Sequence, residues 1–382
     1  MVSSTLAMTT FKYYCMLFYL SNSLIFEDSD ADGQDIMLSV MNLVNQAINR
    51  IHFLLGDYDA ICFFRNKFKG TAFIGTFFNS IYQNWATESV PSFINYYIEV
   101  TRSDNSTSEN EGIIVNRISY NNFMDNDRLQ STIVLGEHYN DAEFFEHILN
   151  FYISKNVRNA NYSMHPMPGN GKQTKDIIRK ELALKHLLVC IVDTDKKYPT
   201  DTPKADSTYS LCAAIPQNQI YHFMALEVHE VENLIPLNYI DNLPWSQYNS
   251  ADRVNKKHFD YLRNDANHIL PYYDYKSGIR KNQELLSSQE YMAFAEECFN
   301  LDEELTNQYH SFSAYVSTKN NKDELLYKLF SGSFLITHTL EMIKGHSQPT
   351  EPELLPFQEH NWNMIGSTLL NWCIAESKDA MI

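Results

Sequence analysis

The chain has 382 residues, of which 44% are hydrophobic and 13% aromatic, with only 12 glycines and 12 prolines. This composition is typical of a compact globular protein and excludes a disordered or fibrous one. The net charge of −17 argues against a general nucleic-acid coat protein, because diffuse affinity for phosphate needs a basic surface. It leaves room for an enzyme that approaches phosphates through a bound metal ion, or through a basic partner.

Residues 1–127 are predicted to form a mostly helical N-terminal region. Residues 11–26 are apolar, but the run is too short to span a bilayer and lacks a signal cleavage site, so it predicts a buried strand or helix. Residues 34–54 place apolar side chains at helical spacing, and residues 72–98 predict an aromatic-rich helix broken near a proline. Residues 102–112 are polar throughout and predict a loop.

The pattern changes between residues 128 and 245, where short apolar runs alternate with helical periodicity. Strands are predicted at 131–135, 161–165, 186–193 and 219–228, and helices at 141–153 and 173–186. The run at 186–193 is continuously apolar, as in a central parallel strand that is buried on both faces. The alternation predicts the α/β fold class, with a parallel sheet and right-handed crossovers.

Residues 246–382 predict a helical C-terminal region. Three helical patterns lie within residues 285–301, 322–343 and 360–375, separated by long polar connections. The six cysteines show no CxxC spacing, which predicts reduced thiols in a cytoplasmic protein. No stretch reaches transmembrane length, so no membrane contact is expected.

Acidic residues follow two of the predicted strands. Glu137 comes just after the first strand, with Asp141 four residues later, and Asp193 and Asp195 stand at the exit of the third. Residues two apart on an extended segment point the same way, and ligands gather beyond the carboxyl ends of parallel strands. Carboxylate oxygens there suit Mg²⁺ or Mn²⁺, which can activate water and stabilise a leaving oxygen of a phosphodiester.

Other patterns carry less weight. The DxD spacing also occurs elsewhere among 47 acidic residues, and only the pair at 193–195 follows a long apolar strand. Residues 28–39 begin like an EF-hand but lack its apolar eighth and acidic twelfth positions, which predicts an acidic loop capping a helix. Residues 166–173 do not match a Walker motif and predict a glycine turn. Basic clusters at 172–185 and 253–257 are interpreted as solvated helix faces, with nucleic-acid contact as the alternative.

The ordered motifs resemble a known family. V-L-G-E-H-Y-N-D (134–141) resembles the TOPRIM opening motif V-E-G-x-x-D, and C-I-V-D-T-D (190–195) resembles its DxD motif. L-E-V-H-E-V-E-N-L-I-P (226–236) is similar to the E-I-E-N-Y-L segment of nuclease-type TOPRIM domains, and P-Y-Y-D-Y-K-S-G-I-R (271–280) to a D-x-K-x-G element. Such domains occur in OLD-family nucleases and in TOPRIM effectors of bacterial anti-phage systems such as PARIS. The resemblance covers roughly residues 128–280.

The resemblance implies a role for each acidic residue of the first two motifs. Glu137 would be a metal ligand or general base, and Asp193 and Asp195 would hold Mg²⁺ or Mn²⁺. Asp141 falls on the second acidic position of the opening motif and would be a further metal ligand. The motif departs from the family at His138, which stands where a glycine usually follows the glutamate.

The later motifs imply three further residues. Glu230 and Glu232 would complete a second metal position, with a solvated turn before a helix as an equal alternative. Lys276 would stabilise a phosphate oxygen, with an ordinary surface lysine as the alternative. The predicted catalytic residues are Glu137, Asp193, Asp195, Glu230 and Lys276, and the predicted metal ligands are Glu137, Asp141, Asp193, Asp195 and Glu232.

By analogy with the family, the chain is expected to be a metal-dependent endonuclease that hydrolyses DNA or RNA, tRNA included. It would act as a toxin effector in antiviral defence, restrained until triggered, with an ATPase sensor subunit as a partner and aromatic helical regions as docking surfaces. The sequence does not decide whether the chain forms a homo-oligomer. One alternative is a catalytically inactive TOPRIM-fold interaction subunit. Another is primase-like or topoisomerase-like phosphoryl transfer, for which no nucleophilic tyrosine motif or polymerase module is evident.

Overall fold

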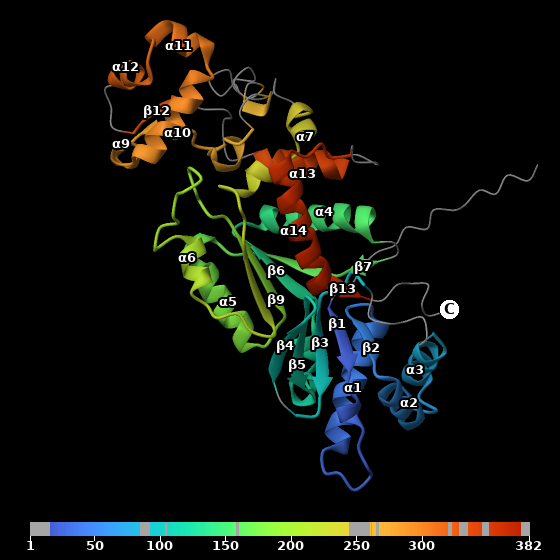
Figure 1. Ribbon diagram of the computed structural model, residues 1–382. Coiled ribbons are helices and arrows are strands. Elements are labelled where there is room, and N and C mark those ends of the chain that lie inside the picture. The colour runs from blue at the N-terminus through green and yellow to red at the C-terminus, as the bar shows by residue number, and fades with distance from the viewer. Residues whose placement is uncertain are drawn as a thin grey trace, which may run out of the picture.

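The computed structural model contains, among the residues it describes, two larger sheets of five and four strands and two small two-stranded sheets, with helices packed around them (Figure 1). It describes residues 16–84, 92–103, 105–157, 160–243, 260, 262–264, 267–319, 323–327, 335–345 and 351–375. No helix within these ranges is both long and apolar enough to cross a membrane. The five cysteines within them, at 62, 190, 212, 298 and 373, are free thiols, as predicted.

The first sheet has five strands in the order β2-β1-β3-β5-β4. The strands are β1 (Leu17–Leu20), β2 (Phe53–Gly56), β3 (Tyr96–Thr101), β4 (Ser106–Asn110) and β5 (Ile113–Ser119). Neighbouring strands are parallel except for β4, which pairs antiparallel with β5 at the edge. Helices α1 (Gly33–Ile48), α2 (Tyr58–Lys67) and α3 (Ala72–Asn84) connect or flank these strands.

The prediction of a mostly helical N-terminal region missed this sheet. The helices expected within 34–54 and 72–98 are present as α1 and α3, but β2 and β3 occupy the ends of those two segments. The loop expected at 102–112 is wrong, because it contains β4. That strand is exposed on both faces, so pairing with β5, rather than hydrophobic periodicity, makes it a strand. The described part of residues 11–26 contains β1, a buried strand as expected.

The second sheet is parallel throughout and has the order β10-β9-β6-β8. Its strands are β6 (Thr132–Gly136), β8 (Met164–Pro168), β9 (Leu188–Val192) and β10 (Tyr221–Ala225). Each overlaps one of the four predicted strands. The expectation of a parallel sheet alternating with helices is therefore confirmed for this part of the chain, which makes the protein α/β.

Helices cover both faces of the second sheet, which explains why its central strands β6 and β9 are buried along their whole length. Figure 1 shows α5 (Thr174–Ala183) and α6 (Thr208–Ala213) on one side, with α4 (Tyr139–Asn156) and α14 (Pro356–Cys373) on the other. Successive residues of β9 alternate between the two layers. Those packed with α5 and α6 are Leu188, Cys190 and Val192, and those in the larger core cluster are Val189 and Ile191.

The C-terminal region is helical with small additions of sheet. It follows the short helix α7 (Leu237–Asp241), and its described helices are α9 (Gln283–Ser287), α10 (Gln289–Asn300), α11 (Glu303–Tyr309), α12 (Phe312–Ser317), α13 (Leu335–Gly345) and α14. Strands β11 (Ile279–Lys281) and β12 (Glu324–Tyr327) form a hydrogen-bonded pair, so the helix predicted over 322–343 is wrong at its start. Part of that segment lies outside the described residues, as does the basic cluster at 253–257.

Helix α14 links the two sheets. Asn371 accepts hydrogen bonds at Oδ1 from the backbone N–H groups of Asn95 and Tyr96, at 2.9 and 3.2 Å. Trp372 stacks on the ring of Tyr96 at 4.7 Å, and its carbonyl accepts a 2.6 Å bond from Thr132 Oγ1 in β6. Beyond the helix, β13 (Ile374–Ala375) pairs antiparallel with β7 (Asn161–Tyr162). These contacts join the end of α14 to both sheets.

The crossing of α14 over α4 gives a direct test of the packing. A Cβ at Gly366 would lie 2.4 Å from Tyr152 Cβ, whereas a Cβ at Gly345, at the end of α13, would meet nothing within 4 Å. We expect Gly366→Ala to lower the free energy of unfolding by about 1–3 kcal/mol, because it overpacks the helix contact. Gly345→Ala should be neutral or slightly stabilising. Urea unfolding measures the stability of both variants. Equal free energies of unfolding for the two would contradict the observed crossing.

Candidate metal centre

Acidic side chains gather beyond the carboxyl ends of the parallel strands. Glu137 directly follows β6, and Asp193 directly follows β9. Glu230 and Glu232 lie in the segment after β10, around the 3₁₀ turn η5 (Val231–Leu234). Parallel strands place their carboxyl ends at one edge, so residues distant in the sequence meet there. Electrostatic interactions between Asp193 and each of the three glutamates show that they share one site.

Glu137 is held at this edge by close backbone packing. A Cβ at Gly136 would lie 2.9 Å from the backbone nitrogen of Ala142, so a glycine is required before the glutamate. The glycine turn after β8 donates from Gly169 N–H to the Gly136 carbonyl at 2.7 Å, and from Asn170 N–H to the Glu137 carbonyl at 2.9 Å. The predicted turn at 166–173 is therefore part of the wall beside Glu137.

Burial raises the pKa of Glu137 to about 7, and the nearby charge of Asp195 adds to the shift, while a hydrogen bond from Thr208 opposes it. Its Oε1 is buried and has no hydrogen-bond partner among the described residues. Asp193, like Glu137, is half-buried. Burial first, and then the charges of Glu137 and Asp141, raise its pKa well above the ordinary value. These carboxyl groups hold protons more tightly than free ones do.

Asp195 departs from the extended geometry predicted for the DxD pair. Its φ is +55°, in the left-handed region that a non-glycine residue seldom adopts. Its backbone N–H donates to the His229 carbonyl at 3.0 Å, and Thr194 Oγ1 donates to the Val228 carbonyl at 2.6 Å. Asp193 and Asp195 therefore do not lie on one strand face. Asp195 is exposed and lines a cavity next to the buried acids.

Asp141 has a structural contact that the prediction did not include. Its Oδ2 accepts a 2.7 Å hydrogen bond from the backbone N–H of His138, the residue that caps the start of α4. This is the N3 position of a capping box, where a carboxylate satisfies an orphan donor of the helix end. Burial still raises the pKa of Asp141 to about 6, and the hydrogen bond from His138 opposes the shift.

Lys276 lies against two of the glutamates. Its Nζ is 3.2 Å from Glu230 Oε2 and 2.9 Å from Glu232 Oε1. Burial would lower the pKa of Lys276, but the two carboxylates outweigh burial and raise it. Burial also raises the pKa of Glu230 to about 8, further assisted by Glu232 and opposed by Lys276. Oε1 of Glu230 and Oε2 of Glu232 are nevertheless buried without a partner among the described residues.

Two further residues join this edge that the sequence did not assign. His229, Glu230 and Asp274 each offer a ligand atom within 4.8 Å of the others, and they are the one group of this kind found among the described residues. His229 Nδ1 lies 2.8 Å from the Lys196 carbonyl, which can only accept, so Nδ1 carries the proton and Nε2 faces Asp274 at 3.6 Å. That is how a metal-binding histidine is usually oriented.

Asp274 belongs to the D-x-K-x-G segment noted in the sequence. Its Oδ1 accepts from the backbone N–H groups of Lys276 and Ser277, and Gly278 N–H donates to its carbonyl at 2.9 Å. Gly278 has a φ of +67°, so a glycine closes this turn at low cost. The spacing D-x-K-x-G could thus have identified Asp274 from the sequence. The His229–Glu230 dipeptide could have identified His229.

A cavity of 370 Å³ opens beside these residues. Asp195, His229, Glu230 and Lys276 line it together with basic side chains from the loop after β9. In that loop, Lys197 Nζ pairs with Glu284 Oε2 at 2.7 Å. The cavity therefore joins acidic groups, suited to a cation, to lysines, suited to an anion.

Comparisons of the chain with models of protein families, with curated proteins and with solved structures each found no match. Function is therefore argued from the chemistry and geometry of this site.

The raised pKa values predict how stability depends on pH in the metal-free protein. Glu137, Asp141 and Glu230 keep their protons up to about pH 7, 6 and 8 in the folded state, whereas their ordinary values are 4.5, 3.8 and 4.5. Between these limits the folded state binds more protons than the unfolded state, so their contribution to stability falls as pH rises from about 4 to 8.

The matched variant is Glu137→Gln, which mimics the protonated side chain. In EDTA, we expect its stability to exceed that of the wild type increasingly between pH 5 and 8, as measured by urea unfolding at each pH. Addition of Mg²⁺ should raise the wild-type midpoint more at pH 8 than at pH 5, because ligands must be deprotonated. If the stabilities of the wild type and Glu137→Gln changed in parallel with pH, the raised pKa assigned to Glu137 would be contradicted.

Proposed function

We propose that this chain is a metal-dependent phosphodiesterase that cuts nucleic acid at the carboxyl edge of the second sheet. The observation that carries the proposal is a set of three buried carboxylate oxygens, Glu137 Oε1, Glu230 Oε1 and Glu232 Oε2, that have no partner among the described residues. Buried polar atoms are nearly always satisfied in folded proteins, and carboxylates that lie close together away from water repel one another. A divalent cation would satisfy both requirements.

The donor set fits the metal that the sequence implied. Oxygen ligands from carboxylates are those preferred by Mg²⁺ and Mn²⁺, and His229 suits Mn²⁺ as well. Glu137 and Asp193 would form one position, and Glu230 and Glu232 a second one, with His229 and Asp274 beside Glu230. When bound, such ions lower the pKa of a coordinated water and stabilise charge on the scissile phosphate and its leaving oxygen.

The protein's own groups supply the rest of the proposed reaction. Glu137 would bind a metal ion or, as the alternative, accept a proton from the attacking water. Water adds to phosphorus and the bond to the leaving oxygen breaks. The leaving oxygen takes up a proton from solvent, giving a phosphate monoester and a hydroxyl. Lys197 and Lys204 line the cavity and would hold the negative nucleic-acid backbone there, at the expense of their ion pairs with Glu284.

The wider role follows the TOPRIM resemblance and belongs to the same proposal. The chain would be a TOPRIM nuclease that acts as a toxin effector in bacterial antiviral defence, with DNA or RNA as substrate and an ATPase sensor subunit as its partner. The net charge of −17 supports a requirement for a partner or trigger, because the bare chain repels nucleic acid.

A second candidate function has its own supporting observation. Lys276 pairs with both Glu230 and Glu232, which partly neutralises this acidic pair without any metal ion. The acidic edge would then be a structural remnant in a catalytically inactive interaction subunit. Metal binding and the effect of neutralising Lys276 separate the two candidates.

The first test measures cleavage directly. The purified chain, together with its proposed partner where one is required, should degrade DNA or RNA with Mg²⁺ or Mn²⁺ and not in EDTA. Glu137→Gln and Asp193→Asn should each reduce the rate at least about 100-fold, because each removes a ligand or base. Asp176→Asn on α5, whose side chain is 66% exposed, is the matched control and should keep full activity. Equal rates in all variants would refute the enzyme.

The second test uses Lys276→Met. In EDTA this variant should lose about 3–5 kcal/mol of stability, because it leaves buried carboxylates without a counter-charge. If the edge is a metal centre, Mg²⁺ or Mn²⁺ should restore much of the lost stability, since the cation replaces the missing charge. A purely structural pair predicts no recovery with metal and full recovery in the double variant Lys276→Met/Glu232→Gln. Unfolding midpoints with and without metal distinguish these results.

A further inference from the structure

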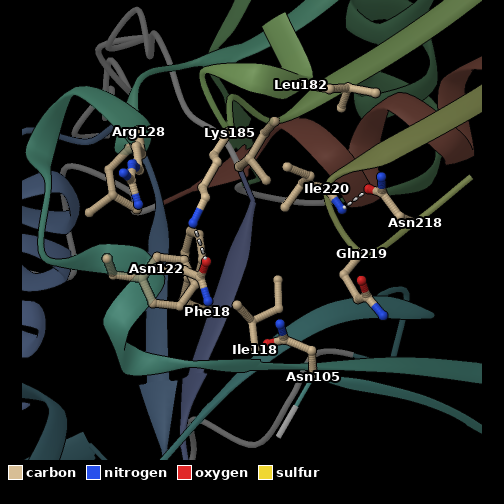
Figure 2. Close-up of a pocket in the computed structure, with 13 residues that line it drawn as sticks. Phe18, Asn105, Ile118, Asn122, Arg128, Leu182, Lys185, Asn218, Gln219 and Ile220 are labelled. Carbon is tan, nitrogen blue, oxygen red and sulfur yellow. Dashed lines mark hydrogen bonds between the residues drawn. The ribbon is translucent and has the colours of Figure 1, made fainter. Parts of the chain in front are cut away.

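A second cavity, of 270 Å³, lies between the two sheets (Figure 2). Its walls come from the end of β5 and the turn after it, and from the segments just before β9 and β10. Leu187 precedes β9 and Ile220 precedes β10, so this cavity meets the amino ends of the strands whose carboxyl ends lead to the acidic residues. It is therefore separate from the proposed metal centre and shares no lining residue with the cavity there.

The charged side chains that line this cavity are both basic. They are Arg128 and Lys185, and no acidic residue is among the described residues of its lining, in a chain with 47 acidic residues. Figure 2 shows Lys185 extending toward Asn122, and its Nζ donates to Asn122 Oδ1 at 3.0 Å. Lys185 has a φ of +63°, so the backbone adopts a left-handed turn where this side chain begins. Asp125 pairs with Arg128 from outside the lining, at 3.6 Å.

Amide side chains supply the neutral polar part of the lining. Asn105 Oδ1 accepts from Ser119 N–H at 3.1 Å, and Asn218 Oδ1 accepts from Ile220 N–H at 2.9 Å. Both contacts fix the amide groups through their oxygens and leave the Nδ2 donors to face other acceptors. Gln219 lies between these groups on the same wall, as Figure 2 shows. Fixed amides of this kind read the donor and acceptor pattern of a planar ligand.

Apolar side chains form the rest of the cavity. Phe18 and Ile118 come from the first sheet, Leu182 from α5, and Ile220 from the segment before β10. The remaining apolar lining residues are Phe123, Leu129 and Leu187. Mostly apolar walls with a few fixed polar groups are the usual composition of a small-molecule site. The volume lies near the lower end of the roughly 300–1,000 Å³ typical of such sites, which selects a small ligand.

We propose that this cavity binds a nucleoside monophosphate. The phosphate would lie against Arg128 and Lys185, the base edge against the amides of Asn105 and Asn218, and the base plane against the half-buried side chains of Leu182 and Ile220. Charge-assisted hydrogen bonds from two cations select a phosphate, and the amides and apolar wall select the nucleoside. The cavity holds one nucleotide rather than a strand. The proposal does not depend on the nuclease activity, because it involves a different cavity.

The experiment measures binding of AMP, GMP, CMP and UMP to the full-length chain by titration calorimetry in EDTA. The protein carries Glu137→Gln in every sample, so metal-dependent binding at the acidic edge does not contribute. At least one nucleotide should bind with a Kd below about 1 mM, and the matching nucleoside and inorganic phosphate should each bind at least about tenfold more weakly. No binding of any nucleotide up to 5 mM (about five times that limit) would overturn the proposal.

Variants locate the binding. Lys185→Gln and Arg128→Gln should each weaken binding at least about tenfold, because each removes a charge-assisted hydrogen bond. Their matched controls, Lys180→Gln and Arg179→Gln, remove the same charges from exposed positions of α5 and should leave the Kd unchanged.

Asn105→Asp keeps the oxygen that accepts from Ser119 but adds a negative charge, and it should also weaken binding about tenfold. Asn105 is exposed, so Asn105→Asp should fold normally. It therefore tests the proposal even if Lys185→Gln or Arg128→Gln folds poorly. Unchanged affinity in all three cavity variants overturns the proposal. So does a preference for a single-stranded oligonucleotide over every mononucleotide, since that would assign the basic groups to strand binding.

Discussion

Repulsion between carboxylates at one edge of the parallel sheet is the constraint on which the rest of the site depends. Asp193 interacts with Glu137, Asp141, Glu230 and Glu232, and burial strengthens every one of these interactions. The folded chain limits the repulsion in two ways, by holding protons on the acids and by placing Lys276 against two of them. A cation is the third way, and it is the one that would also enable chemistry. Packing on both faces of the sheet supplies the stability that holds these groups together.

The second sheet could be predicted from the sequence because its central strands β6 and β9 are buried on both faces. Continuous apolar runs bounded by turns identified β6, β9 and β10, and the intervening helical periodicity gave their parallel arrangement. The first sheet was missed because its strands depend on their neighbours. β4 is polar and exposed on both faces, and only the ladder to β5 defines it. Strands β2 and β3 adjoin stronger helical patterns, which concealed them.

The acidic edge was accessible to sequence reasoning because strand ends determine it, and the ends of parallel strands coincide. The detailed geometry of this edge could not be predicted from the sequence. The left-handed backbone at Asp195 turns that side chain away from the direction an extended segment predicts. The pairing of Lys276 with Glu230 and Glu232 requires residues 270–278 to fold back over η5. Asn233 fixes this contact by donating from Nδ2 to the carbonyls of Leu270 and Tyr273, at 2.6 and 2.9 Å. Such tertiary hydrogen bonds leave no periodic signal.

The two cavities lie at opposite ends of the same strands of the second sheet, with basic side chains at one end and acidic side chains at the other. β9 has five residues, so at about 3.3 Å per residue roughly 17 Å separate the basic cavity at its start from the acids at its end. An anionic ligand meets favourable charge at the first end without help. At the second end it meets repulsion until a cation is bound. A nucleotide and a nucleic-acid strand would thus be distinguished by metal requirement as well as by size, although both carry the same phosphate group.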